Sequence, residues 1–209
     1  MIYDITRMVS PTTAVFPGDT PYQAVPLSRI SDGASVNLVT ITTTPHVGTH
    51  ADAPYHYLPA GRHPSQLALE PYIGQAQVIS VANSSGEITL EDVGEAHLVA
   101  GVPRILIHTC ASEWADDVWR TDFPYPSVAL IEALAARGIL LIGLDVPSFD
   151  HADSTLLPGH QALGRHQIMN LENLCLRDVP DGVYDLSALP LKLDLACASP
   201  VRAVLRTLD

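Results

Sequence analysis

The chain has 209 residues, of which 47% are hydrophobic and only 16% charged, a composition that fits one folded domain and argues against disorder. Its formal net charge of −12 argues against nucleic acid and anionic membranes as binding partners. The N-terminus has no basic-then-apolar signal and no apolar run is long enough to span a bilayer, so we expect a cytoplasmic protein.

Strands are the first elements that the sequence predicts. Residues 2–5, 36–44 and 75–81 have strand character, and the second of these segments is rich in β-branched side chains. Residues 104–110 and 139–145 are almost wholly apolar, as expected for strands that are covered on both faces. These segments predict a core built mainly on a β-sheet.

Helices are predicted at residues 91–99 and 127–138 from the spacing of their apolar side chains, and Gly138 is placed to end the second. Residues 160–170 predict a short helix. Strands are then predicted to close the fold at residues 171–176, 182–193 and 199–208. A helix directly before the last apolar strand is typical of a parallel sheet. We therefore expect an α/β fold, with residues 1–209 as a single domain that has a mixed β-sheet core and flanking helices.

The cysteines predict no metal knuckle. Cys110, Cys175 and Cys197 are odd in number, widely spaced and without a Cys-x-x-Cys pair. We expect reduced, buried thiols of an intracellular protein, and none of them falls within the histidine segment described next.

Histidines are concentrated in the segment PHVGTHADAPYH, residues 45–56. Its imidazoles and carboxylate belong to His46, His50, Asp52 and His56. These are the ligand types that catalytic zinc, manganese or iron ions take. Pro45, Gly48 and Pro54 disfavour a continuous helix. The segment therefore predicts a turn at the end of a strand, in which metal ligands converge.

Other polar residues are assigned ordinary structural roles. The remaining histidines are expected on the surface or in the core: His63, His97, His108, His151 and His166. Asp145 and Asp150 are expected to cap turns, and Trp114 and Trp119 to pack in or near a pocket.

The histidine segment resembles the motif H-x-G-T/A-H-x-D-A-P-x-H of the cyclase family, which includes the bacterial kynurenine formamidases or arylformamidases. It matches the motif at every fixed position. Further likeness to the formamidase branch lies in VFPGDTP, LIGLDVPSFD, HQALGRHQIMNLENL and ALPLKLDLACASPVRAVLRTL. The resemblance thus runs nearly from end to end. It implies a swivelling β/β/α-like fold and a homodimer.

The resemblance also implies a binuclear site for two divalent ions, with zinc first and manganese or iron as alternatives. His46, His50 and Asp52 would hold the first ion. Asp52 would also reach the second ion, which His160 would bind, and Glu172 would contact both. Read without the resemblance, His160 suits a surface or capping role. Glu172 is explained equally well by a nearby cation, metal or arginine, and by a solvated strand face.

Two further positions acquire a role from the resemblance. His56 matches the catalytic acid–base of the family. Phe16 falls where the formamidases carry a tryptophan that forms an aromatic wall against the substrate ring. A phenyl ring has less area and no N–H donor, which makes the choice of ring substrate less certain.

The implied activity is hydrolysis of the aryl formamide N-formyl-L-kynurenine to L-kynurenine and formate in tryptophan degradation. Phe16 keeps open the alternative of another aryl or cyclic amide hydrolase of the family, such as one that opens the isatin ring. A non-catalytic metal-binding protein is a remoter alternative, because structural zinc sites are usually rich in cysteine.

Overall fold

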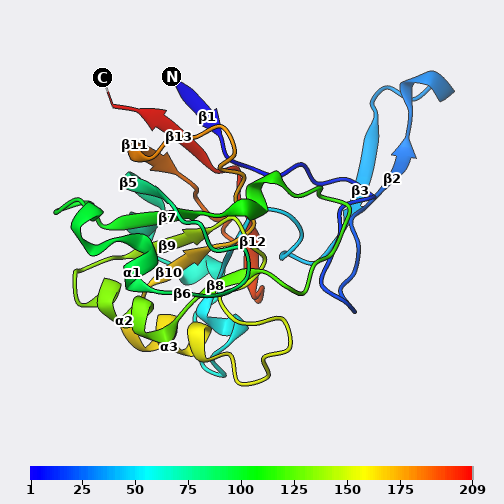
Figure 1. The fold of residues 1–209 in the computed structure, drawn as a ribbon. Helices are drawn as coiled ribbons and strands as arrows, with labels where there is room; N and C mark the ends of the chain where they lie inside the picture. The colour runs from blue at the N-terminus through cyan, green and yellow to red at the C-terminus, as the bar shows by residue number, and fades with distance from the viewer. Residues whose placement is uncertain (209) are drawn as a thin grey trace.

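A seven-stranded mixed sheet lies at the centre of the computed structural model, which describes residues 1–208 (Figure 1). In spatial order its strands are β1 (Ile2–Asp4), β13 (Val204–Thr207), β11 (Gly182–Ser187), β5 (Ile73–Ser80), β7 (Arg104–His108), β9 (Leu141–Leu144) and β10 (Met169–Leu171). The strands from β5 to β10 run parallel, and the pairs from β1 to β5 are antiparallel. The mixed sheet that the sequence predicted is therefore confirmed.

Helices α2 (Val128–Ala135) and α3 (Pro158–His166) cover one face of this sheet (Figure 1). Ile105 and Ile107 of β7 share a buried apolar cluster with Leu130 of α2. Because alternate side chains of a strand point to the same face, these two isoleucines anchor the helical layer.

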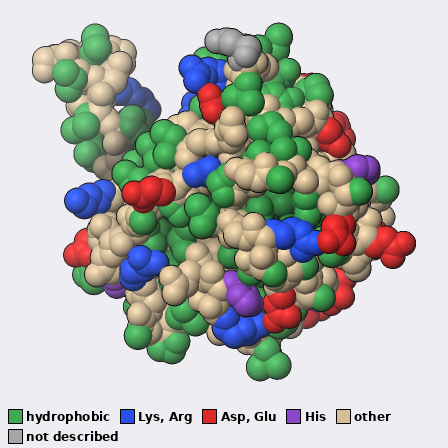
Figure 2. All heavy atoms as spheres, turned by 90° about the vertical axis from the view of Figure 1, so that its left-hand side faces the viewer, with side chains coloured by type: hydrophobic (Ala, Val, Ile, Leu, Met, Phe, Trp, Pro, Cys, Tyr) green, Lys and Arg blue, Asp and Glu red, His purple; other side chains and the backbone are tan. Residues whose placement is uncertain are grey.

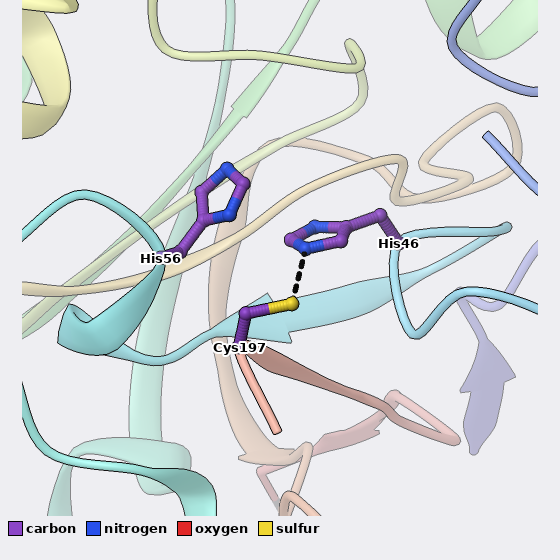
Figure 3. Close-up of side chains that lie close together, drawn as sticks. All are labelled: His46, His56 and Cys197. Atoms are coloured by element: carbon purple, nitrogen blue, oxygen red, sulfur yellow. Dashed lines mark hydrogen bonds between the residues drawn. The ribbon is translucent and has the colours of Figure 1, made fainter. Parts of the chain in front are cut away.

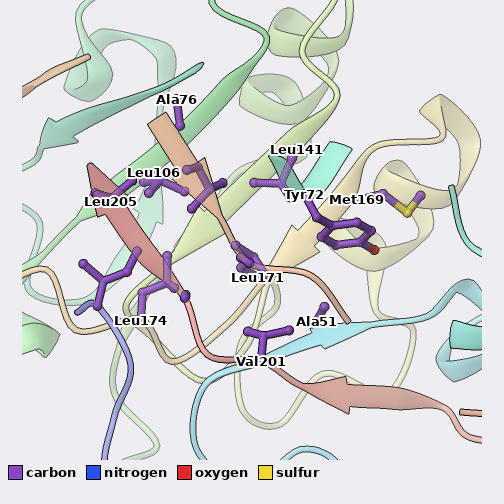
Figure 4. Close-up of a cluster of buried hydrophobic side chains, with 14 of the residues drawn as sticks. Ala51, Tyr72, Ala76, Leu106, Leu141, Met169, Leu171, Leu174, Val201 and Leu205 are labelled. Carbon is purple, nitrogen blue, oxygen red and sulfur yellow. The ribbon is translucent and has the colours of Figure 1, made fainter. Parts of the chain in front are cut away.

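A two-stranded antiparallel ribbon of β4 (His50–Asp52) and β12 (Ala198–Pro200) covers the opposite face. Leu106 points away from its two isoleucine neighbours and joins a second buried cluster with Ala51 and Val201 (Figure 4). Helices, sheet and ribbon form three layers, which is the β/β/α arrangement that the resemblance implied. The ribbon also carries the densest part of the histidine segment to the edge of the core.

Most of the predicted elements are present with adjusted bounds. The predicted strands at 2–5, 36–44, 75–81, 104–110, 139–145 and 182–193 correspond to β1, β3 (Leu38–Thr42), β5, β7, β9 and β11. The helix predicted at 127–138 is α2, which begins after a Ser127 cap that accepts from the N–H of Leu130. Gly138, at φ +78°, follows its end as predicted.

The helix predicted at 91–99 is wrong beyond its first turn. Helix α1 (Leu90–Val93) ends because Gly94 takes a φ of +74°, and Glu95–His97 form a separate 3₁₀ turn. The apolar spacing here comes from two short elements that meet at an angle.

The helix and strand predicted at 160–170 and 171–176 are also displaced. Helix α3 ends before Gln167, whose φ is +55°, and the chain then enters β10. The predicted strand is wrong after the end of β10, where Asn173 has a φ of +55°. The strand predicted at 199–208 is divided between β12 and β13, which lie in different sheets.

Two small sheets complete the fold. Strands β6 (Gly86–Ile88) and β8 (Pro124–Pro126) form a parallel pair. Strands β2 (Gln23–Ser28) and β3 (Leu38–Thr42) form an antiparallel arm that stands clear of the body (Figures 1 and 2). Among residues 1–208, none of the helices has the length and apolar character that crossing a bilayer requires.

The arm exposes apolar side chains along its whole length. Val25, Leu27, Leu38, Val39 and Ile41 are each between 46% and 65% exposed. An isolated two-stranded hairpin is marginally stable in water, and exposed apolar surface of this kind marks an interaction site.

Candidate metal centre

The five candidate metal ligands converge from three parts of the fold. His50 and Asp52 lie on β4 and His46 in the turn before it, whereas His160 begins α3 and Glu172 follows β10. All but His46 are nearly fully buried. The structure therefore brings together every residue that the resemblance proposed as a ligand.

One group of donor atoms surrounds one oxygen of Asp52. Its Oδ1 atom lies 3.1 Å from Nδ1 of His46 and 3.3 Å from Nε2 of His50, and these two nitrogens are 3.2 Å apart. Ligands bound at about 2.0–2.1 Å to a tetrahedral ion stand roughly 3.3 Å apart. The three atoms thus have the separations of neighbouring ligands on one ion.

A second group surrounds the other oxygen of Asp52. The Nε2 atom of His160 lies 3.4 Å from Oδ2 of Asp52 and 3.4 Å from Oε1 of Glu172. The remaining Glu172 oxygen, Oε2, lies 3.3 Å from Nε2 of His50. Asp52 and Glu172 therefore each offer one oxygen to each group.

Backbone pairing explains why residues so distant in sequence meet here. The N–H of His50 donates to the carbonyl of Glu172 at 3.2 Å, and the N–H of Glu172 donates back at 3.0 Å. On its other side β4 pairs with β12, with Asp52 opposite Ala198. Two sets of main-chain hydrogen bonds hold the short strand that carries the central ligands.

In His50 and His160, the ring nitrogen that faces away from Asp52 is hydrogen-bonded to an oxygen acceptor. Nδ1 of His50 donates to the carbonyl of Gly48 at 2.9 Å, and Nδ1 of His160 lies 2.6 Å from Oδ2 of Asp150. Asp150 also accepts the backbone N–H groups of Gly159 and His160, at 2.7 and 3.1 Å. These bonds direct Nε2 of both imidazoles toward Asp52, as outer partners of metal ligands commonly do.

The pKa values of the imidazoles and of the Asp52 carboxylate at this centre depend on one another. Burial disfavours protonation of His46, but hydrogen bonds to Asp52 and Cys197 outweigh it and raise its pKa to about 9. Burial is likewise outweighed at His50, where Asp52 and Glu172 raise the pKa to about 10. Burial acts to raise the pKa of Asp52, yet the surrounding imidazoles hold it well below its usual range.

The donor set fits a divalent cation. Oδ1 of Asp52 is buried and accepts no well-aligned hydrogen bond from residues 1–208, although two imidazole nitrogens face it. A buried carboxylate oxygen in this state is costly unless a cation meets it. Imidazole nitrogen and carboxylate oxygen are ligands that zinc, manganese and iron accept.

His56 lies at the exposed side of this centre. It ends the 3₁₀ helix Pro54–His56, and its ring centroid is 4.3 Å from that of His46 and 5.9 Å from that of His160. Unlike the four buried ligands, its side chain is open to solvent. This position suits a group that exchanges protons with a bound molecule.

Cys197 lies outside the histidine segment of the sequence but reaches the centre in the fold. Its Sγ atom lies 3.2 Å from Nε2 of His46, and the imidazole of His56 lies beside both groups (Figure 3). Hydrogen bonds to both imidazoles lower the pKa of Cys197 to about 6. The three cysteines are free, as predicted, but Cys110 is exposed and Cys175 and Cys197 are only half-buried.

Cys197 is hard to find from sequence because only the pairing of β12 with β4 brings it to the histidines. Asn170 was missed for a related reason: its amide donates to Oδ2 of Asp52 at 2.9 Å from the neighbouring strand β10. The two aspartates cap neighbouring segments and not the turn of residues 146–149 that they flank. Asp150 caps the start of α3, and Asp145 accepts four hydrogen bonds from the backbone and hydroxyl groups of Thr109 and Ser112.

A cavity of about 260 Å³ opens above the centre. His46, His50, His56, His160 and Glu172 line its base. Its other walls include Phe16 and Trp119, whose rings meet edge to face at a centroid distance of 5.3 Å.

The aromatic residues of this cavity come from distant loops. Phe16 occupies the wall that the resemblance implied, and Trp119 supplies a second ring, as the predicted position near a pocket allows. His151 also lines the cavity, whereas Nδ1 of His63 donates to the carbonyl of Ala196 at 3.0 Å.

Comparison with known proteins gives a consistent picture. A family model described as "Putative cyclase" matches residues 3–151. The chain is 44% identical to a kynurenine formamidase of Bordetella pertussis, over 99% of this chain and 98% of that protein. It is 43% identical to a kynurenine formamidase of Bordetella petrii, with the same coverage of 99% and 98%.

Solved structures share the fold. A potential metal-dependent hydrolase with cyclase activity superposes with a TM-score of 0.83 at 25% identity, covering 98% of this chain and 96% of the other. An isatin hydrolase bound to thioisatinate superposes with a TM-score of 0.83 at 22% identity, covering 98% and 91%. At that identity the second likeness concerns the fold alone.

Proposed function

This chain belongs to the cyclase family, and from that premise we propose that it is a metal-dependent arylformamidase. It hydrolyses N-formyl-L-kynurenine to L-kynurenine and formate in tryptophan degradation. One observation carries the proposal: two groups of metal donors share Asp52 at the base of an aromatic-walled cavity. End-to-end similarity to kynurenine formamidases supports the choice of substrate. Residues 1–209 act as one catalytic domain.

Two divalent ions, with zinc first and manganese or iron as alternatives, would occupy the centre. His46, His50 and Asp52 would hold one ion, and His160 with Asp52 and Glu172 the other. The placement of one Asp52 oxygen in each donor group supports this bridging assignment. When bound, such ions lower the pKa of a water molecule and polarise the carbonyl oxygen of an amide.

His56 supplies the proton transfer. An anilide nitrogen is a poor leaving group until it is protonated. His56 takes a proton from the attacking water and delivers it to that nitrogen, so that a C–O bond replaces the C–N bond and a neutral arylamine leaves. Its exposed side chain, which lines the cavity beside His46 and His160, supports this role.

The aromatic wall selects a flat substrate. Phe16 and Trp119 stand edge to face on the cavity wall, where an aryl ring can stack against them while its formyl group reaches the donors. The cavity of about 260 Å³ has room for one small aromatic ligand.

A side-by-side assay tests the proposal. The metal-loaded protein is given N-formyl-L-kynurenine and isatin in separate reactions, and each is repeated after chelation and after metal is restored. We expect kcat/KM to favour N-formyl-L-kynurenine and activity to follow metal content. A preference for isatin would assign the chain to ring opening, and inertness toward both would favour a non-catalytic metal-binding protein.

We also propose that the enzyme is a cytoplasmic homodimer. The arm of β2 and β3 exposes apolar side chains along both strands, and a second copy of the chain can cover two such arms reciprocally. Three unpaired cysteines suit the reducing cytoplasm.

A further inference from the structure

We infer that His46, His56 and Cys197 form a second cation site, rich in sulfur and nitrogen, which takes thiophilic divalent cations such as Cd²⁺ or excess Zn²⁺. Their ligand atoms all lie within 4.8 Å of one another. One thiolate and two imidazoles are soft or intermediate ligands, and three protein ligands leave a position open for water.

The two nitrogens of His46 face different groups. Nδ1 lies 3.1 Å from Oδ1 of Asp52, whereas Nε2 lies 3.2 Å from Sγ of Cys197 (Figure 3). A neutral imidazole has one nitrogen with a free lone pair. A cation held through Nε2 therefore competes with an ion held through Nδ1, so the new site and the first donor group share one ligand.

The backbone holds Cys197 in place. Its carbonyl accepts the N–H of Ala53 at 2.9 Å, and the carbonyl of the preceding Ala196 lies 3.0 Å from Nδ1 of His63. The carbonyl of Ala53 in turn accepts the N–H of His56 at 2.8 Å. Thiol and imidazole are thus attached to adjoining, hydrogen-bonded segments.

His56 completes the site by a side-chain movement. It is exposed, so its imidazole can turn toward Sγ of Cys197 without opening the core. A cation there removes His56 from proton transfer and His46 from the first donor group, and so inhibits the enzyme. This inhibition rests on the proposed function, whereas the cation site itself does not.

The test uses the metal-loaded enzyme carrying Cys110→Ser and Cys175→Ser, so that Cys197 is the remaining thiol. Titration with Cd²⁺ is followed by the ultraviolet thiolate-to-cadmium charge-transfer absorbance. We expect a saturable signal from this parent and none after the further change Cys197→Ser. Thermal unfolding of each variant checks that it is folded.

His56→Ala, made in the same parent, separates this site from binding of Cd²⁺ within the neighbouring donor groups. We expect the affinity for Cd²⁺ to fall by at least roughly 10–100-fold. This is the loss that removal of a partner outside the ligand set causes, and removal of a ligand should cost no less. An unchanged affinity, or a charge-transfer signal that survives Cys197→Ser, would overturn the site.

Formamidase activity is measured over the same titration. We expect the parent to lose activity as the charge-transfer signal rises, and the Cys197→Ser variant to resist the same Cd²⁺ concentrations. A full signal with undiminished activity would overturn the inhibition and count against His56 as the acid–base. A parent without any formamidase activity would refute the proposed function, while the absorbance titration would still decide the cation site.

Discussion

Asp150 holds the imidazole of His160 through an Nδ1–Oδ2 contact of 2.6 Å while also capping the helix on which His160 lies. One carboxylate thus fixes both the position of a candidate ligand and the direction of its Nε2 atom. Asp150→Asn replaces a charged acceptor by a neutral amide. We expect metal affinity at the His160 group to fall by roughly 10–100-fold.

Calorimetric titration with Zn²⁺ measures that loss. Asp153→Asn is the matched control, because Asp153 lies in the same loop with a side chain that is 87% exposed. If Asp150→Asn bound two ions as tightly as the unchanged protein, the positioning role of Asp150 would be refuted.

His56→Ala separates proton transfer from metal binding. We expect unchanged metal content and a fall in kcat of about 10²–10⁴, the usual contribution of a general acid–base. Elemental analysis and steady-state kinetics are measured on the same preparation, with the exposed His166→Ala as control. Parallel loss of metal and activity would instead make His56 a ligand.

Asp52→Ala tests the sharing of one carboxylate between two ions. Because Oδ1 and Oδ2 of Asp52 face different donor groups, we expect occupancy of both to decrease together. The metal content after dialysis measures the occupancy of both groups, and thermal unfolding of the metal-free proteins shows whether the variant folds. Retention of two tightly held ions would contradict the bridging assignment.

Metal uptake should depend on pH in a defined direction. In the metal-free protein the pKa of His46 is raised to about 9 and that of His50 to about 10, so both imidazoles are protonated at pH 7. A cation must displace these protons. We therefore expect proton release on Zn²⁺ binding near neutrality, and apparent affinity that rises as pH approaches those values.

Calorimetry in two buffers of different ionisation enthalpy counts the released protons. The number should decrease as the pH rises through both pKa values, because His46 and His50 then bind the cation without losing a proton. Binding at neutral pH without proton release would show that the imidazoles are already neutral in the metal-free protein.

Charge placed on the arm tests the proposed dimer. In Leu27→Asp with Ile41→Asp, two exposed apolar side chains that would be buried by a second copy become carboxylates. We expect a monomer by light scattering with unchanged thermal unfolding of the body. Leu156→Asp, at an 83% exposed position outside the arm, is the control. A variant that remained dimeric would place the interface elsewhere.

Local sequence patterns were enough to predict the central strands and part of the candidate metal centre. The apolar runs at 104–110 and 139–145 predicted central strands, because burial on both faces requires continuous apolar sequence. His46, His50 and Asp52 were predicted as ligands because they lie close together in one short segment. Prediction failed where a single left-handed residue ended an element, as Gly94 and Asn173 do.

The resemblance had implied that His160 and Glu172 join that segment, but only the tertiary structure gives the contacts that bring distant residues to it. Hydrogen bonds between His50 and Glu172, and the pairing of β4 with β12, bring Glu172 and Cys197 to His46 and Asp52. Nothing in the local sequence of either residue records this, because strand pairing depends on main-chain groups that every residue has. The kinds of donor atoms could therefore be read along the chain, whereas their grouping around the two oxygens of Asp52 came from the folded sheet.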